Sequence, residues 1–283
     1  MKIGITDDSY TAFYGVDEGF SRIAEHGYDA VDAQILARIA SPLFALPLPA
    51  FEKEIRAYRA AVRRQGLVVS QTHGPWRSAD DYRTPEARRY QFDGMVRALY
   101  GTALLGCDKL VLHPVMPTGA VDRDPDESRE INLAFFSALL VEAEKAGVRI
   151  CLENMPFVGQ GLARPKETLA LVRALDSRYC GVCLDTGHAA IFGISPADAV
   201  RAIGKEHLLA LHIHDNDGNR DLHLLPGEGV IDWEAFSSAL HEIGFSGVFS
   251  LETEVSKKIE GPARDRPERD LAALARRLAD GKK

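Results

Sequence analysis

Short apolar and β-branched runs recur along the whole chain and alternate with longer segments of helical periodicity. A run of about four to eight apolar residues is typical of a buried strand, whereas apolar residues spaced three and four apart are typical of an amphipathic helix. The strand-like runs cover residues 2–6, 29–34, 67–73, 109–114, 149–155, 181–187, 208–214 and 247–253. The helical segments cover residues 17–26, 50–65, 85–106, 127–146, 166–176, 196–205, 233–243 and 265–279.

This alternation predicts an α/β fold. A strand that is regularly followed by a helix predicts a parallel sheet, because the chain must cross back before each new parallel strand. Eight such units predict a single (β/α)8 TIM barrel that spans residues 1–283 as one domain. An open, doubly wound sheet is the competing fold. It is disfavoured because no GxGxxG segment follows the first run.

Four strand-like runs in the second half of the chain end in an acidic residue or a histidine. These residues are Glu153, Asp185, His212 and Glu252. The carboxyl ends of barrel strands share one mouth, so we expect the four side chains to meet there. Buried carboxylates repel one another unless a cation lies between them. This set of oxygen and nitrogen donors suits a divalent metal ion such as Mn²⁺, Mg²⁺, Co²⁺ or Zn²⁺.

The residues two positions before these four polar residues are all small. Because strand side chains alternate, they should point into the barrel one layer below the predicted metal site and leave room for it. The leucines between them should face the surrounding helices. The small residues are Cys151, Cys183, Ala210 and Ser250, and the leucines are Leu152, Leu184, Leu211 and Leu251.

More candidate ligands lie at the same predicted mouth. A single histidine at a strand end is more often structural than a ligand, but several at one rim favour a functional site. They would either contact a substrate or extend one metal site into several. These residues are His73, His113, His188, Asp221 and His223.

Composition narrows the classes of function. Hydrophobic residues make up 46% of the chain and charged residues 27%, as is usual for a globular protein. The net charge of −7 disfavours binding to nucleic acid or to an acidic membrane surface. No apolar run is long enough to span a bilayer, and Met1 leads directly into a strand without a secretion signal, so we expect a cytoplasmic protein. Four cysteines are too few for a disulfide framework and are expected to be buried thiols.

Several short motifs together identify a family. LEN, LDTGH, HxHD, PGEGxIDW and LET, in this order, resemble the xylose isomerase-like TIM barrel superfamily of sugar isomerases and epimerases, which also contains endonuclease IV. The resemblance to its ketose 3-epimerases implies that Glu153, Asp185, His212 and Glu252 hold the metal ion and that the two glutamates also move the proton. It further implies substrate contacts for His188 and, at a less specific match, for Arg220.

The expected reaction is isomerisation or epimerisation of a sugar or sugar phosphate. A divalent ion on the carbonyl and hydroxyl oxygens stabilises the enediolate that forms when the proton leaves carbon. Glu153 and Glu252 lie on different strands, so they can flank a bound substrate as the catalytic acid and base. His73, His113 and Trp76 are further candidates for substrate contact. Dehydratases and other lyases of the superfamily use the same chemistry.

Two alternatives stay open. One is a non-catalytic sugar-binding or polyol-binding barrel. The other is an endonuclease IV-like multinuclear zinc phosphodiesterase acting on abasic DNA. The ligand pattern of endonuclease IV finds matches at His73, His113, Glu153, Asp185, His188, His212, Asp221, His223 and Glu252.

Charge and loop composition weigh against the DNA-binding alternative. The loop at residues 35–51 is apolar and proline-rich, where a DNA-binding loop should carry cations. It is better suited to a lid, or to a contact surface for a second subunit of a homo-oligomer. A local phosphate-binding edge could form only from a short arginine cluster, which is more simply interpreted as a solvated helix face. The cluster comprises Arg77, Arg83, Arg88 and Arg89.

Overall fold

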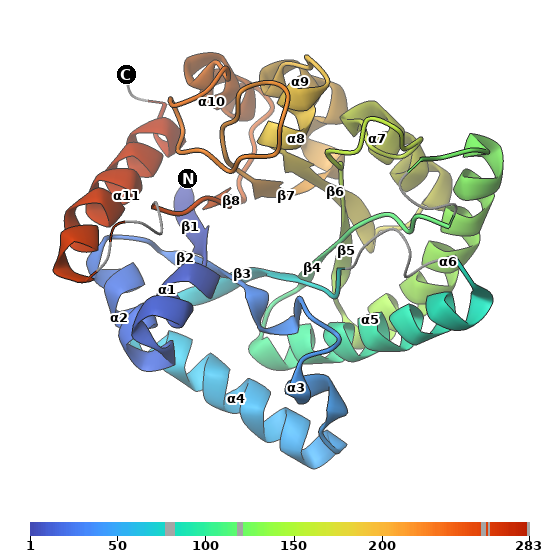
Figure 1. The fold of residues 1–283 in the computed structure, drawn as a ribbon, viewed down its shortest axis with the longest axis horizontal. Coiled ribbons are helices and arrows are strands. Elements are labelled where there is room, and N and C mark those ends of the chain that lie inside the picture. The colour runs from blue at the N-terminus through green and yellow to red at the C-terminus, as the bar shows by residue number, and fades with distance from the viewer. Residues whose placement is uncertain (77–82, 118–120, 256–258, 260, 282–283) are drawn as a thin grey trace.

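The strands of the computed structural model form one eight-stranded parallel barrel with helices around it (Figure 1). The structure describes residues 1–76, 83–117, 121–255, 259 and 261–281. The strand order is β7-β6-β5-β4-β3-β2-β1-β8, so every strand lies beside its neighbour in sequence. The strands are β1 (Lys2–Thr6), β2 (Ala30–Ala33), β3 (Val68–His73), β4 (Lys109–Leu112), β5 (Arg149–Glu153), β6 (Cys180–Asp185), β7 (Leu208–His212) and β8 (Val248–Leu251). The predicted fold class is confirmed.

The barrel closes between β7 and β8 through the residue that follows β7. Ile213 forms an isolated parallel bridge with Leu251. The Ile213 amide donates to the Ser250 carbonyl at 3.0 Å, and the Glu252 amide donates to the Ile213 carbonyl at 3.0 Å. Closure therefore brings the ends of β7 and β8, with His212 and Glu252, next to each other.

The helices lie outside the ring of strands (Figure 1). The predicted helices appear as α2 (Val16–Glu25), α4 (Leu48–Arg64), α5 (Pro85–Leu105), α6 (Pro125–Ala146), α7 (Pro165–Leu175), α9 (Pro196–His207), α10 (Trp233–Glu242) and α11 (Asp265–Ala279). Three short helices and two 3-10 turns were not predicted. They are α1 (Asp8–Tyr14), α3 (Pro42–Ala45), α8 (Thr186–Ile191), Gln34–Leu36 and Gly261–Arg264.

Local sequence explains where the long helices begin and end. The side chains of Thr84, Asp124 and Asp232 each accept a hydrogen bond from a backbone amide in the first turn of the following helix. Gly106 and Gly147 end α5 and α6 with φ of 76° and 67°, a left-handed conformation that glycine adopts without a Cβ clash. The chain can therefore turn back sharply into the next strand.

The main core lies between the strands and the helices and contains Leu152, Leu184, Leu211 and Leu251. A separate small layer fills the inside of the barrel and consists of Val111, Cys151, Cys183 and Ala210. Ser250 is also fully buried. These observations confirm the predicted division between small residues inside the barrel and leucines outside it. All four cysteines are buried free thiols, as expected, and no helix in the described part of the chain could cross a membrane.

Candidate metal centre and cavity

Four side chains meet at the carboxyl ends of β5 to β8. Glu153, Asp185 and His212 are the last residues of their strands, and Glu252 follows β8 directly. One ligand atom from each lies within 4.8 Å of a ligand atom of every other. We call these four residues the central cluster. Three of its members are buried and Glu252 is partly exposed toward the mouth, so an ion held there would be reached from one side.

The central cluster is short of positive charge. His212 Nδ1 lies 3.0 Å from Glu153 Oε1 and 3.2 Å from Glu252 Oε2. Glu153 Oε2 and Glu252 Oε2 are buried, and neither has a well-aligned hydrogen-bond partner among the described residues, although His113 Nε2 and His212 Nδ1 lie 3.2 Å from them, respectively. Buried carboxylate oxygens without such a partner are costly unless a cation satisfies them. The donor set and these two oxygens therefore fit a divalent metal ion.

Asp185 is held in place before any ion binds. Its Oδ1 atom accepts a hydrogen bond from the His188 amide at 2.6 Å, and its Oδ2 atom lies 3.1 Å from His214 Nε2. Asn154 accepts from the Asp185 amide at 2.8 Å and donates to the Asp185 carbonyl at 3.0 Å. The LEN and LDTGH motifs thus lock the ends of β5 and β6 together.

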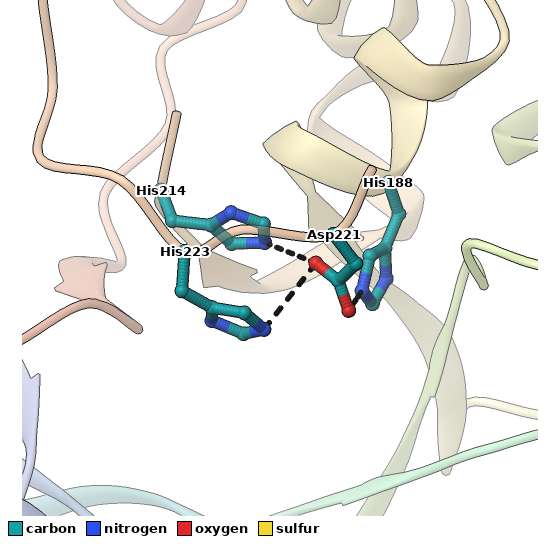
Figure 2. Close-up of side chains that lie close together, drawn as sticks. All are labelled: His188, His214, Asp221 and His223. Atoms are coloured by element: carbon teal, nitrogen blue, oxygen red, sulfur yellow. Dashed lines mark hydrogen bonds and ion pairs between the residues drawn. The ribbon is translucent and has the colours of Figure 1, made fainter. Parts of the chain in front are cut away.

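A second group of candidate ligands lies beside the central cluster. Figure 2 shows three imidazoles around the carboxylate of Asp221, which is in the loop after β7. Asp221 Oδ2 is 3.3 Å from His188 Nε2, and Asp221 Oδ1 is 3.3 Å from His223 Nε2 and 3.7 Å from His214 Nε2. His188 comes from α8 and His214 lies just after β7. These four residues could hold another ion.

A third group shares Glu153 with the central cluster. His73 Nε2, from β3, lies 3.5 Å from Glu153 Oε2, and His113 Nε2, just after β4, lies 3.2 Å from the same atom. The two imidazoles meet edge to face with ring centroids 4.9 Å apart. Glu153 therefore belongs to two groups of candidate ligands and could serve either of them.

The acidic groups of the central cluster differ in their readiness to ionise. Burial opposes ionisation of Glu153, but the facing imidazoles of His212 and His113 lower the pKa of its carboxyl well below the usual range. Burial raises the pKa of Glu252, and the charge of Glu153 adds to this rise while His212 opposes it. The surroundings thus shift the pKa values of the two glutamates in opposite directions.

A cavity of about 500 Å³ opens above the three groups, a size typical of a small-molecule site. Trp76 and Arg38 lie on its wall, with the guanidinium 5.9 Å from the indole ring. His73, His113, His188 and His223 also line it. Arg220 does not: it is exposed and donates to Asp217 Oδ2 from two guanidinium nitrogens at 2.9 and 2.8 Å.

Three residues near the site were not predicted. Asp32 is the last residue but one of β2 (Ala30–Ala33), so it lies one position short of the strand end that marks the other candidates. His214 is the second histidine of the HxHD motif and was passed over for His212. Arg38 sits within the apolar loop, where no pattern distinguishes it. Of the predicted arginine cluster, Arg77 lies outside the described residues and Arg89 pairs with Asp93 on the outer helix α5.

Comparison with known proteins gives consistent matches. A family model described as xylose isomerase-like TIM barrel matches residues 20–278. A D-psicose 3-epimerase of Ruminiclostridium cellulolyticum is 26% identical over 82% of the chain and 75% of its own length. A probable endonuclease 4 of Citrifermentans bemidjiense is 31% identical over 63% of the chain and 66% of its length. The crystal structure of a D-tagatose 3-epimerase-like protein superposes with a TM-score of 0.76 at 26% identity, covering 99% of this chain and 98% of the other.

Proposed function

The chain belongs to the xylose isomerase-like TIM barrel family, and on this basis we propose that it is a divalent-metal-dependent isomerase or epimerase of a small sugar. The observation that carries the proposal is the central cluster, in which three carboxylates and one imidazole converge beneath a cavity of small-molecule size and two buried glutamate oxygens lack a well-aligned hydrogen bond among the described residues. The similarity to sugar epimerases of the family supports it.

Glu153, Asp185, His212 and Glu252 are the proposed ligands of the ion, which would be Mn²⁺, Mg²⁺, Co²⁺ or Zn²⁺. When bound, such an ion would stabilise the negative charge that develops on substrate oxygens as a proton leaves the adjacent carbon. Asp185 and His212 serve only to hold and orient it. The central cluster lies largely buried at the floor of the cavity, where the lower local dielectric strengthens these electrostatic interactions.

Glu153 and Glu252 are the proposed acid and base. The surroundings lower the pKa of Glu153 and raise that of Glu252, and the two carboxyls come from different strands, so one can take a proton from the substrate while the other gives one back. They extend from β5 and β8, and both line the cavity. A substrate held between them would be approached from two directions, as inversion at one carbon requires.

The cavity wall favours an uncharged sugar over a sugar phosphate. Among the described lining residues, Arg38 is the one side chain with a permanent positive charge, whereas Asp8, Asp221 and Glu254 add negative charge. His73, His113, His188 and Trp76 are the proposed substrate contacts. Arg220 would join them only after leaving Asp217.

Carboxamide substitutions of the two glutamates test the proposal. Glu153→Gln and Glu252→Gln should each lower turnover of ketose sugars by at least about 100-fold, because each removes a group that moves the proton. Chromatography of a ketose panel incubated with metal-loaded protein measures the effect. Glu242→Gln, on the outer face of α10 and paired with Arg201, is the matched control and should keep wild-type turnover. Sugar binding without turnover by the wild-type protein would instead favour a non-catalytic sugar-binding barrel.

A second candidate function, a multinuclear phosphodiesterase, is favoured by one observation. The three ligand groups bring together all nine positions that match the endonuclease IV pattern, with Glu153 shared between two groups. Metal analysis of the purified protein separates the two candidates. One ion per chain supports the isomerase, whereas three zinc ions together with cleavage of abasic-site DNA and no sugar turnover would overturn it.

A further inference from the structure

Asp32 is a fully buried carboxylate on β2 that none of the proposed roles uses. A charged group in such a place needs close partners, because its transfer from water is otherwise very costly. Gln71 Nε2 donates to Asp32 Oδ2 at 2.8 Å, and Gln34 Nε2 donates to Asp32 Oδ1 at 3.3 Å. The third partner is His212, whose Nε2 atom lies 3.0 Å from Asp32 Oδ2.

The two nitrogens of His212 face opposite ways. Nδ1 points to the carboxylates of Glu153 and Glu252, whereas Nε2 points to Asp32. The ring also stacks nearly parallel on His73, with centroids 5.6 Å apart and an interplanar angle of 13°. One face of the ring and both of its nitrogens therefore have partners that fix its orientation.

The contact with Asp32 also selects the tautomer. An ionised carboxylate can only accept hydrogen bonds, so Nε2 must carry the hydrogen in this contact. In the neutral imidazole, Nδ1 then keeps its lone pair on the side that faces the Glu153 and Glu252 carboxylates, where it could bind an ion held by the central cluster. Gln71 supports the geometry by donating also to the Leu211 carbonyl at 3.2 Å, which ties Asp32 to the strand that carries His212.

We propose that Asp32 is a positioning residue that holds His212 in the Nε2–H tautomer, so that Nδ1 binds the divalent ion of the central cluster. This inference rests on the proposed function, because it presupposes that His212 is a ligand. A carboxylate partner of this kind changes metal affinity by about 10- to 100-fold when it is removed. Asp32 is not among the described residues that line the cavity or form the central cluster, so it would act through His212.

Metal affinity of substituted proteins tests the proposal without an activity assay. Asp32→Asn, which keeps the shape of the side chain, and Asp32→Ala, which removes the acceptor, should weaken Mn²⁺ binding by about 10- to 100-fold in a competition with a chelator. Asp29→Asn is the matched control, since Asp29 lies just before the opposite end of β2 and bonds the Ile3 amide and Arg276. It should bind Mn²⁺ like the wild type. Circular dichroism verifies that each variant is folded.

The tautomer itself is observable in the wild-type protein. With ¹⁵N-labelled histidine and bound Zn²⁺, the NMR signals that disappear in His212→Gln should show a hydrogen on Nε2 and none on Nδ1. Zinc bound through Nε2, or wild-type Mn²⁺ affinity in folded Asp32→Asn and Asp32→Ala, would overturn the role of Asp32 and leave the proposed function standing. A wild-type protein that binds no divalent ion would overturn both.

Discussion

Asp7 is a buried carboxyl whose environment disfavours its charge. It follows β1 and is 3% exposed. Burial raises the pKa of Asp7 to about 7. Hydrogen bonds from the Tyr58 hydroxyl at 2.6 Å and from the backbone N–H of Gln34 at 2.8 Å oppose the rise. The negative charges of Asp8 and Asp32 add to it. Asp7 therefore destabilises the folded protein once it ionises.

Replacing Asp7 with asparagine should stabilise the protein increasingly as the pH rises. The folded-state pKa of about 7 exceeds the usual value of 3.8, so the folded state holds a proton that the unfolded state has lost in this interval. The resulting penalty is absent below the unfolded pKa and complete above the folded one. Between pH 5 and pH 8, the free energy of unfolding of Asp7→Asn should rise relative to wild type by roughly 2–3 kcal/mol. Urea titrations of metal-free protein measure this, and a difference that does not change with pH would contradict it.

Sequence patterns predicted most of the side chains that lie at the barrel mouth. They did not predict the hydrogen bonds that fix the orientation of those side chains. Glu153, Asp185 and His212 end apolar runs, and barrel closure alone brings such positions together. The roles of Asp32 and His214 depend instead on which way neighbouring imidazoles point. That orientation follows from packing between strands distant in sequence, which no local pattern records.

Asn154 links two strands of the barrel at the point where both carry a cluster residue. Its amide makes paired hydrogen bonds with the backbone of Asp185. Asn132, on α6, makes the same paired contact with the backbone of Val115, at 2.8 Å for both bonds. Both asparagines are fully buried. Both residues thus fix a backbone segment by paired hydrogen bonds, but only Asn154 fixes the backbone of a residue in the central cluster.

The two asparagines form a matched pair for substitution. Asn154→Ala and Asn132→Ala should each destabilise the protein by about 2–4 kcal/mol, because each leaves buried backbone groups unpaired. Only Asn154→Ala should also weaken Mn²⁺ binding, since it frees the backbone of Asp185. Chemical unfolding and metal titration measure the two effects. Equal loss of metal affinity in both variants would show that Asn154 acts through general stability alone.

The helices that escaped prediction share a physical cause. The α1, α3 and α8 helices are 7, 4 and 6 residues long. Two turns or fewer cannot display a repeating apolar face, so periodicity does not reveal them. They lie in the loops after β1, β2 and β6, on the same side of the barrel as the site. The eight longer helices cover the barrel, and most of them show a clear apolar face, which is why their positions could be predicted; α5 and α6 also bury polar and small residues such as Gln91 and Asn132.

The protein is acidic overall, and its candidate ligands gather further carboxylates at one end of the barrel. The chain carries a net charge of −7, while the candidate ligands add buried carboxylates at one end of the barrel. A divalent cation would be attracted to this mouth, whereas a polyanion would be repelled from it at low salt. The closed barrel supplies rigid strand ends on which the ligands are fixed, and its small inner layer leaves room beneath them.

Proton exchange with solvent tests the proposed reaction most directly. Metal-loaded protein incubated with a ketose in deuterium oxide should place deuterium on the carbon next to the carbonyl, because the carboxyl that delivers the new proton has exchanged its own with solvent. Removal of the ion by a chelator should abolish this uptake, and Mn²⁺ or Co²⁺ should restore it. NMR and mass spectrometry of the recovered sugar measure the incorporation. Sugar turnover without deuterium uptake, or uptake that persists in metal-free protein, would contradict the proposed mechanism.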